Sequence, residues 1–464
     1  MSGLLRAKLA IARGAGALAR LRGSGGTSLP GRVLIGLEPD AIAKLGSRLP
    51  DGSALISATN GKTTTAAMTS EILSRHGVEV VHNRAGANMA GGVATALLDA
   101  AGPGERISGR LGLFEIDELW LARVAAALRP RAILLGNLFR DQLDRYGELE
   151  AIADSWREVL LAGEGYAVLN ADDPLLADLG REREDGDNVL YFGVEDDSLA
   201  LPGLAHAADA KHCRNCGAPY IFDAVYLGHL GRYRCPSCGR ARPEPRICAT
   251  GVHLDGVRAA RFELRTPAGT AEVRLGLPGL YNVYNALAAA ALTTALGVPI
   301  ETVVDGLQAT RAAFGRAETV AIAASRGSRE MRILLVKNPA GANEVLRTLA
   351  LEPGTHQLLG VLNDQIADGR DVSWIWDADF ELLADRVAGV VCSGNRAADL
   401  AARFKYAGVA EAQIEIIPSL EDALEAAAAS GEDGRPLYAL PTYTAMLALR
   451  ELLSRRGEVA SRWS

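Results

Sequence analysis

Short apolar runs alternate with helical patterns through the first part of the chain. Four runs are almost continuously apolar, as strands inside a covered sheet are: ALISAT (54–59), RLGLFEI (110–116), AILLGNL (132–138) and YAVLNAD (166–172). The segment TTAAMTSEILSRHG (64–77) has the spacing of a helix. This alternation predicts an α/β fold built on a parallel, doubly wound sheet.

The pattern changes twice further along the chain. Residues 206–245 are polar and cysteine-containing, with no helical periodicity, and a helical pattern returns at 282–313. A second α/β pattern follows Arg316. Its expected strands are MRILLV (331–336), HQLLGVL (356–362) and VAGVVCSG (387–394).

These changes predict three parts. Residues 1–43 form a lead helix and linker, and residues 44–316 form a central domain that carries 206–245 as an insert. Residues 317–464 form a C-terminal Rossmann-like α/β domain. The length of 464 residues agrees, because domains average roughly 150 residues. A hydrophobic content of 48% with 23% charged residues excludes intrinsic disorder.

The N-terminal segment LLRAKLAIARGAGALARLRG (4–23) is apolar but interrupted by Arg6, Lys8, Arg13, Arg20 and Arg22. This charge density excludes a secretory signal. The sequence contains no uninterrupted run of 18 apolar residues, so no transmembrane helix is predicted. The segment is expected to be a surface helix packed on the body. The alternative is a basic amphipathic helix that touches anionic lipid. We expect a cytoplasmic protein, with a peripheral position at the inner face of the cell membrane as the alternative.

The net charge of −7 argues against a nucleic-acid partner held by bulk charge. Only six of the 49 basic residues are lysines, so each lysine is a candidate for a specific role. Lys62 lies in ATNGKTTT (58–65), after an expected strand and at the start of an expected helix.

In that place backbone N–H groups and the helix dipole face an anion, which predicts an ATP phosphate site. Lys62 can reach the β- and γ-phosphates, and Thr63 can place its hydroxyl on Mg²⁺. The usual glycine six positions before the lysine is Ile56 here, and the alternative interpretation is a tight strand-to-helix turn. The candidate ATP-binding residues of this loop are Thr59, Asn60, Gly61, Lys62, Thr63 and Thr64.

Four of the six cysteines form two C-x-x-C pairs, each followed by glycine: Cys213, Cys216, Cys235 and Cys238. Two such pairs can complete a tetrahedral thiolate site, so the insert is predicted to be a zinc ribbon. A closed four-sulfur site leaves no open coordination position, which predicts a structural Zn²⁺. A disulfide or redox pair is the alternative. Cys248 and Cys392 are interpreted as ordinary buried thiols.

Six segments, in order, resemble those of the Mur ligases, the ATP-dependent ligases of peptidoglycan synthesis: ATNGKTTT (58–65), FEIDE (114–118), NLFRDQLDR (137–145), VLNADD (168–173), GLYNVYNA (279–286) and GRAE (315–318). The resemblance implies that Glu115 helps to hold Mg²⁺. It also implies that Asn282 and Asn285 lie on the adenine side and that Arg316 pairs with phosphate. Glu115 could instead be a surface acid at a strand end, and the asparagines could be ordinary helix caps.

The departures from the family pattern narrow the resemblance. Gln142 and Tyr281 replace histidines, and no lysine occurs between Lys62 and Lys211, where the family usually has a carbamylated lysine. With the segment NDQIADGRDVSWIWD (363–377), the chain resembles the branch that forms the synthetase subunit of lipid II isoglutaminyl synthase. That branch is implied to amidate the α-carboxyl of D-Glu in the lipid II stem peptide to D-isoglutamine, through an acyl phosphate.

The resemblance implies a heterodimer in which a separate GatD-type glutaminase supplies the ammonia. An acid of this chain would orient the partner's catalytic histidine, and Asp371 is favoured over Asp368 and Asp377. The alternative is a loop of solvated acids. Cys392 lies in VVCSGN, but the region has only His356 and no G-x-C-x-G, so it is not expected to be a nucleophile.

Two other functions remain open. The chain could be an amino-acid-adding Mur ligase or a folylpolyglutamate-type ligase. It could also be a nucleotide-binding scaffold without catalysis.

Overall fold

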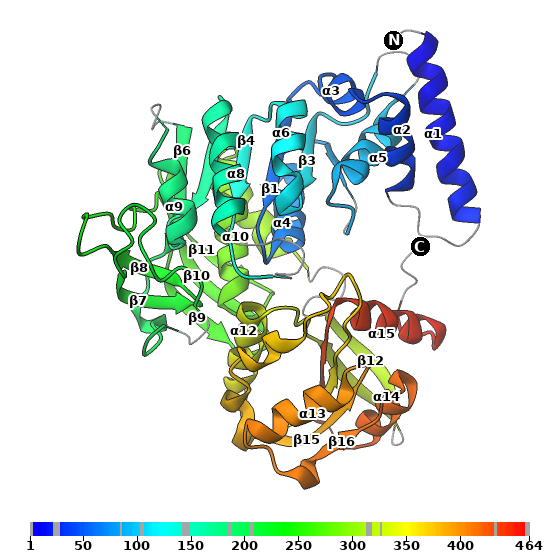
Figure 1. Ribbon diagram of the computed structural model, residues 1–464, viewed down its shortest axis with the longest axis vertical. Helices are drawn as coiled ribbons and strands as arrows, with labels where there is room; N and C mark the ends of the chain where they lie inside the picture. Colours follow the sequence, from blue (N-terminus) through cyan, green and yellow to red (C-terminus); the bar gives the residue numbers. More distant parts are fainter. Residues whose placement is uncertain are drawn as a thin grey trace.

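The computed structural model describes residues 3–21, 28–83, 86–102, 106–141, 149–183, 188–204, 208–311, 318–324, 327–430 and 434–459. The chain forms two α/β units, the larger one above the smaller in Figure 1. Helix α1 lies at one edge of the larger unit. No helix in the described ranges combines the length and the apolarity that crossing a bilayer requires.

The larger unit contains a nine-stranded sheet in the order β11-β10-β9-β6-β5-β4-β1-β3-β2. The strands from β2 to β9 are parallel, whereas β9, β10 and β11 form an antiparallel extension. The strands are β1 (Ser53–Ser57), β2 (Val80–His82), β3 (Leu111–Glu115), β4 (Ala132–Leu135), β5 (Tyr166–Asn170), β6 (Val189–Val194), β9 (Ile247–Asp255), β10 (Ala259–Thr266) and β11 (Gly269–Leu275).

Helices cover both faces of this sheet. Along β1, Ala54 and Ile56 belong to one apolar core and Leu55 to the other, which explains the continuously apolar run. The core of Ile56 includes side chains of α4 (Lys62–Arg75), α10 (Leu280–Ala295) and α11 (Ile300–Ala309). The core of Leu55 includes side chains of α5 (Ala90–Ala100), α6 (Leu121–Leu128), α8 (Leu149–Ala162) and α9 (Pro174–Gly180). The predicted doubly wound sheet is confirmed.

Three helices precede β1: α1 (Gly3–Leu21), α2 (Leu29–Leu37) and α3 (Ala41–Gly46). Helix α2 packs closely on α5, because a Cβ on Gly31 would lie 1.8 Å from the carbonyl oxygen of Gly91. Leu5, Leu9 and Ala12 of α1 are buried in the same core. The N-terminal helix therefore packs on the body, as expected.

The smaller unit contains a six-stranded sheet in the order β12-β13-β17-β14-β15-β16, with only β12 antiparallel. Its strands are β12 (Glu318–Ala324), β13 (Gly327–Ile333), β14 (His356–Val361), β15 (Val387–Ser393), β16 (Ile414–Ile416) and β17 (Leu437–Pro441). The core on one face includes α12 (Pro339–Ala350) and α13 (Ala397–Tyr406), and that on the other α14 (Leu420–Ala429) and α15 (Tyr443–Arg455). The described residues also include the 3₁₀ helices η1 (Glu118–Trp120), η3 (Asp197–Leu199), η4 (Ser373–Trp376), η5 (Phe380–Arg386) and η6 (Glu411–Gln413).

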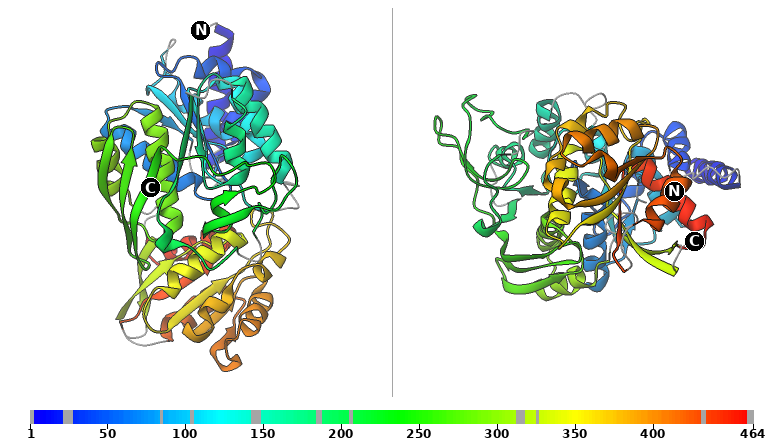
Figure 2. Two further views of the ribbon diagram at one scale, coloured as in Figure 1. Left: turned by 90° about the vertical axis from the view of Figure 1, so that its left-hand side faces the viewer. Right: turned by 90° about the horizontal axis from the view of Figure 1, so that it is seen from below.

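A two-stranded antiparallel hairpin, β7 (Ile221–Leu227) and β8 (Leu230–Arg234), extends from the larger unit beside β9 (Figure 2). The structure also differs from the sequence expectation in two places. The helical pattern at 282–313 is divided into α10 and α11, because Gly297 takes φ +89° and Pro299 is the extended N-cap residue before α11. The strand expected at 331–336 ends at Ile333. The next residues, Leu334 and Leu335, line the cavity between the two units.

Candidate functional site

The loop between β1 and α4 has the geometry of a phosphate loop. Gly61 takes φ +86°, and a Cβ there would lie 2.0 Å from Oδ1 of Asn285, so only glycine fits. Asn137 holds the loop from the end of β4: its Oδ1 accepts from the amide of Asn60 at 2.8 Å, and its Nδ2 donates to the carbonyl of Asn60 at 2.9 Å. The amides at the start of α4 are therefore held in place before any anion binds.

Lys62 is buried at the first position of α4. Its Nζ lies 3.0 Å from Oε2 of Glu118 and also donates to the carbonyl of Ala58. Burial alone would lower the pKa of Lys62, but the charges of Glu118 and Glu115 raise it above its ordinary value. The lysine is therefore a fixed cation at the loop.

Glu115 ends β3 beside the loop and is 4% exposed. Its Oε1 accepts from Oγ1 of Thr63 at 3.1 Å, and among the described residues its buried Oε2 has no hydrogen-bond partner. Asn83 holds the backbone of Glu115 through two hydrogen bonds, at 2.8 and 2.9 Å. A hydroxyl and a carboxylate with one free oxygen are the donors that Mg²⁺ prefers, so this pair fits that ion.

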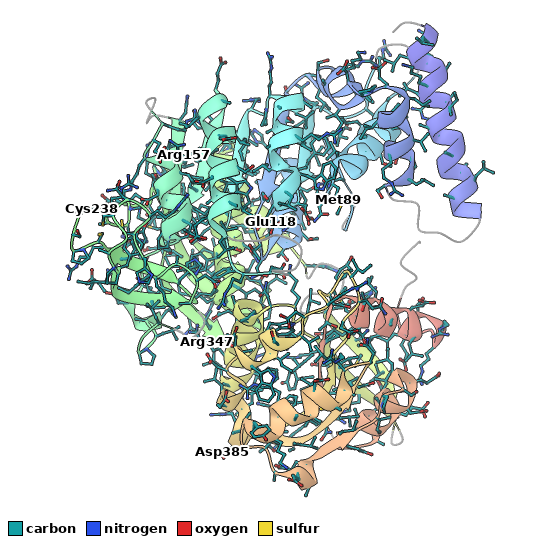
Figure 3. All side chains as sticks on the ribbon, viewed as in Figure 1. Met89, Glu118, Arg157, Cys238, Arg347 and Asp385 are labelled. Carbon is teal, nitrogen blue, oxygen red and sulfur yellow. The ribbon has the colours of Figure 1, made fainter. Side chains whose placement is uncertain are left out.

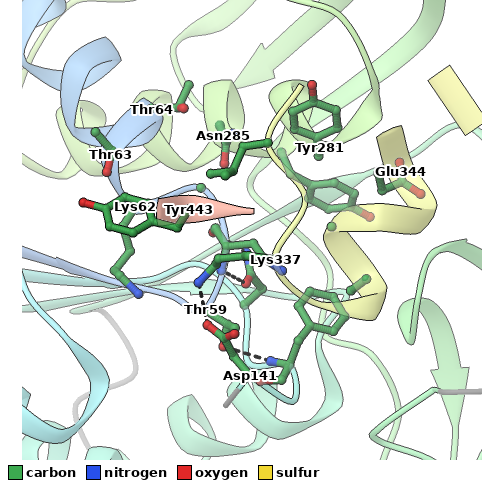
Figure 4. Close-up of a pocket in the computed structure, with 18 of the residues that line it drawn as sticks. Thr59, Lys62, Thr63, Thr64, Asp141, Tyr281, Asn285, Lys337, Glu344 and Tyr443 are labelled. Carbon is green, nitrogen blue, oxygen red and sulfur yellow. Dashed lines mark hydrogen bonds and ion pairs between the residues drawn. The ribbon is translucent and has the colours of Figure 1, made fainter. Parts of the chain in front are cut away.

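A cavity of about 390 Å³ lies between the two units and connects the loop to the second sheet (Figure 4). The loop residues Thr59 to Thr64 of the larger unit and Lys337, Glu344 and Tyr443 of the smaller unit line this cavity. Lys337 forms an ion pair with Asp141. Neither residue has a role predicted from the sequence, although Lys337 is one of only six lysines and follows an expected strand, and Asp141 belongs to the segment NLFRDQLDR (137–145).

Asn282 and Asn285 lie in the first two turns of α10 and line the same cavity. Nδ2 of Asn285 donates to Oδ1 of Asn282 at 3.0 Å, and Nδ2 of Asn282 donates to the carbonyl of Pro278 at 2.7 Å. Oδ1 of Asn285 accepts from Thr65 at 3.4 Å. The two asparagines therefore brace the phosphate loop. Arg316 lies outside the described residues.

The four cysteines of the insert converge. The sulfurs of Cys213 and Cys238 are 3.6 Å apart, those of Cys216 and Cys235 are 3.4 Å apart, and all four lie within 4.8 Å of one another. In each pair the following glycine has a positive φ and donates its amide to the carbonyl of the first cysteine. The cluster can hold one metal ion, and its thiolates suit Zn²⁺. Figure 3 shows Cys238 at the far side of the larger unit from α1.

The tip of the β7–β8 hairpin reaches back to the phosphate loop. Leu227 and Leu230 line the cavity, and His229 is fully buried with its ring 4.7 Å from that of Phe139. The amide of Phe139 donates to Oγ1 of Thr59 at 3.0 Å. The cysteine-containing insert thus supports the ATP loop, a long-range contact that no sequence pattern indicated.

The three candidate acids of 363–377 have different surroundings. Asp368 is 4% exposed and accepts from the amide of Thr444 at 2.7 Å. An oxygen of Asp377 lies 4.0 Å from Nη2 of Arg140. Asp371 is exposed before η4, and the hydroxyl and amide of Ser373 lower the pKa of its carboxyl, which therefore stays ionised.

Cys392 lies fully buried within β15, and burial raises the pKa of its thiol to about 12. A protonated, buried thiol is not a nucleophile, in agreement with the expectation.

Two family models match the chain: the Mur ligase middle domain over residues 56–216 and the MurT ligase C-terminal model over 335–446. The chain is 33% identical to "Lipid II isoglutaminyl synthase (glutamine-hydrolyzing) subunit MurT" of Streptococcus pneumoniae, over 93% of both chains. It is 31% identical to the protein of that name from Staphylococcus aureus strain N315, over 95% of both chains.

Among solved structures, a pseudomurein peptide ligase type C from Methanothermus fervidus superposes with a TM-score of 0.66 at 22% identity, over 89% of this chain and 80% of that one. These relatives, together with the middle-domain match, define a ligase of the Mur ligase class, which confirms the resemblance. Within that class, the chain belongs to the MurT family.

Proposed function

We propose that this chain is the synthetase subunit that amidates the α-carboxyl of D-Glu in the stem peptide of lipid II, yielding D-isoglutamine. The membership of the MurT family supports the substrate, since its relatives are named for this activity. One structural observation carries the chemistry: a phosphate loop with a buried, charged Lys62 shares one cavity with a second lysine, Lys337. A carboxyl phosphorylated there would lie near two positive charges.

The reaction has two balanced steps. A carboxylate oxygen of the substrate attacks the γ-phosphorus of ATP, which forms an acyl phosphate and releases ADP. Ammonia then attacks the carbonyl carbon, phosphate leaves with the electron pair of the C–O bond, and the nitrogen loses a proton. Activation is needed because oxide is a poor leaving group whereas phosphate leaves readily.

The residues of the loop would hold the nucleotide. The amides of the Thr59–Thr64 loop, with the charge of Lys62, would neutralise the negative charge that develops on the transferred phosphoryl group. Thr63 and Glu115 would hold Mg²⁺, which supplies further charge neutralisation when bound. Asn282 and Asn285 are placed to position the loop, and their adenine contact remains part of this proposal.

A GatD-type glutaminase would supply ammonia in a heterodimer. Asp371 would orient the histidine of that partner, because it is exposed and ionised while the Asp368 carboxylate is already bonded to Thr444. The cysteine cluster would hold one structural Zn²⁺. The chain would act in the cytoplasm, at the inner face of the cell membrane where its lipid-linked substrate is found.

The function is tested with purified chain, ATP, Mg²⁺, lipid II and three nitrogen sources: ammonium, glutamine with the glutaminase, and free amino acids. We expect amidation by mass spectrometry with ammonium alone and with glutamine plus glutaminase. Lys62→Met should lower the rate with both sources at least about a hundredfold. Amino-acid incorporation without amidation would instead identify an amino-acid-adding or folylpolyglutamate-type ligase. Nucleotide binding without any phosphate release would identify a scaffold.

A further inference from the structure

The outer face of α1 carries a row of exposed apolar side chains. Leu4 is 67% exposed, Ile11 is 56% exposed and Leu18 is 60% exposed. They are spaced by seven residues, which is about two helical turns, so the three side chains lie along one line of the helix.

The row of Leu4, Ile11 and Leu18 is not part of the contact between α1 and the rest of the larger unit. The opposite stripe, Leu5, Leu9 and Ala12, is buried in the core of the larger unit. Arg13 further anchors the helix through the carbonyls of Leu98 and Ala101, at the end of α5. Figure 1 shows α1 at the edge of the molecule, with its far side turned away from the rest of the chain.

The charge of this region identifies what can cover the row. Residues 1–37 contain six basic residues and no acid, although the whole chain has a net charge of −7. Arg6 is exposed on another side of α1 from the row, whereas Lys8 is paired with Glu38 at 3.1 Å. A second copy of the chain would bring the same positive charge to the contact and be repelled. A surface of anionic headgroups over an apolar layer matches both the row and its charge.

We propose that α1 lies flat on an anionic lipid surface, with Leu4, Ile11 and Leu18 inserted among the acyl chains and the positive charge of the N-terminal segment, including that of Arg6, attracted by the headgroups. The purpose of this contact rests on the proposed function, whose acceptor is lipid-linked. The binding itself is independent of turnover and can be measured without it.

The placement of α1 relative to the cavity agrees with this purpose. Helix α1 packs on α2, and α2 packs on α5. Gly86, Asn88 and Met89, which lead into α5, line the cavity. The lipid-facing helix therefore belongs to the flank of the larger unit from which the cavity wall at Met89 is built (Figure 3).

The test is co-sedimentation of the full chain with vesicles of phosphatidylglycerol and phosphatidylcholine, compared with pure phosphatidylcholine vesicles. We expect binding to the anionic vesicles and at least about tenfold weaker binding to the neutral ones. The triple variant Leu4→Gln, Ile11→Gln and Leu18→Gln should lose anionic-vesicle binding at least about tenfold. Its helix and fold should persist, because the three positions are exposed and glutamine is a good helix former.

A matched control changes three other exposed apolar residues, each about half exposed: Leu161→Gln, Leu351→Gln and Ile416→Gln. It should bind vesicles like the native chain. Arg6→Gln should weaken binding to anionic vesicles about fivefold and leave neutral vesicles unaffected.

The proposal is overturned if the native chain does not bind anionic vesicles, or if the control triple loses binding as much as the α1 triple. It is also overturned if the native chain is a dimer that the α1 triple converts to a monomer while vesicles remain unbound, since a second copy would then cover the row.

Lipid II amidation separates this proposal from the proposed function. The α1 triple should amidate detergent-solubilised lipid II at the native rate and vesicle-embedded lipid II more slowly, whereas absence of amidation in the native chain would contradict only the function.

Discussion

Asn60 in the phosphate loop and Asn338 at the start of α12 exchange amide hydrogen bonds across the two units. Nδ2 of Asn338 donates to Oδ1 of Asn60 at 3.0 Å, and Nδ2 of Asn60 donates to Oδ1 of Asn338 at 3.3 Å. Oδ1 of Asn338 also caps α12 by accepting from the amide of Gly341 at 2.9 Å. The side chain of Asn338 thus links the smaller unit to the phosphate loop and also caps the N-terminus of α12.

Replacing Asn338 separates these two tasks. Asn338→Asp keeps the cap but cannot donate to Asn60, so the KM for ATP should rise about fivefold, the equivalent of one hydrogen bond of about 1 kcal/mol. Asn338→Ala loses the cap as well and should destabilise the protein by a further ~1 kcal/mol. Steady-state kinetics and thermal unfolding measure the two effects. An unchanged KM in both variants would show that the amide pair does not position the loop.

Lys337→Met removes the cation that faces the phosphate loop. Because a fixed charge on the transferred group contributes about 3–4 kcal/mol to catalysis, kcat should fall about 10²- to 10³-fold. Lys44→Met is the matched control, since that lysine pairs with Glu38 on the surface. Ammonium-driven amidation is measured for both, with thermal unfolding to account for the Asp141 carboxylate left unpaired. A kcat within twofold of the native value would exclude Lys337 from the reaction.

Asp371→Asn should leave ammonium-driven amidation unchanged and abolish glutamine-driven amidation in the complex, because only the partner's histidine needs the carboxylate. Asp385→Asn, at another exposed acid of the same unit, is the control and should retain both activities. Equal losses with ammonium and with glutamine would contradict a role for Asp371 in the partner's site.

Burial lowers the pKa of His356 below its ordinary value of 6.5, so the folded protein holds this ring neutral. The unfolded chain binds the proton more readily than the folded chain. The contribution of His356 to the stability of the folded protein is therefore complete above about pH 6.5, and it is lost as the pH falls toward the pKa of the folded state. The free energy of unfolding, measured in denaturant, should decrease as the pH is lowered from 7.5 to 5. Part of this decrease should be absent from the variant His356→Gln. His76→Gln, at an exposed histidine, is the control. An identical pH dependence in the native chain and His356→Gln would contradict this assignment.

Cys213→Ser should remove the metal and unfold the insert. We expect about one zinc per native chain by elemental analysis and a loss of stability greater than about 3 kcal/mol in the variant. Because the hairpin tip contacts Phe139 next to Thr59, the KM for ATP should rise as well. Cys248→Ser, at a buried thiol outside the cluster, should keep the zinc and the KM. Native stability with zinc retained in Cys213→Ser would refute a structural metal.

Several features of the site could be read from the chain because they are local. The phosphate loop depends on Gly61, Lys62 and Thr63 in consecutive positions between a strand and a helix. Each C-x-x-C-G pair forms its turn within a few residues. The four cysteines converge when these two turns pack against each other. The doubly wound sheet followed from runs such as Ala54–Ile56, whose alternate residues enter opposite cores. The division at residues 43 and 316 and the role of each site residue stay predictions.

Long-range pairing could not be read in this way. The antiparallel extension β9–β11 and strand β12 have exposed faces, and their alternating residues carry little of the apolar signal that marks a buried strand. Lys337 and Asp141 are separated by 196 residues, and Asn60 and Asn338 by 278, so no local pattern connects them.

The amino-acid sequence by itself determined the class of fold, the phosphate loop and the cysteine cluster, because neighbouring residues make each of them. Only the tertiary structure decided which distant groups come together: Lys337 and Lys62 line one cavity, the hairpin tip contacts Phe139 next to Thr59, and Asn338 bonds to Asn60. It also left Leu4, Ile11 and Leu18 uncovered while Leu5 and Leu9 became core. The physical reason is the same in each case, since burial and contact depend on how separate elements pack and not on residue type alone.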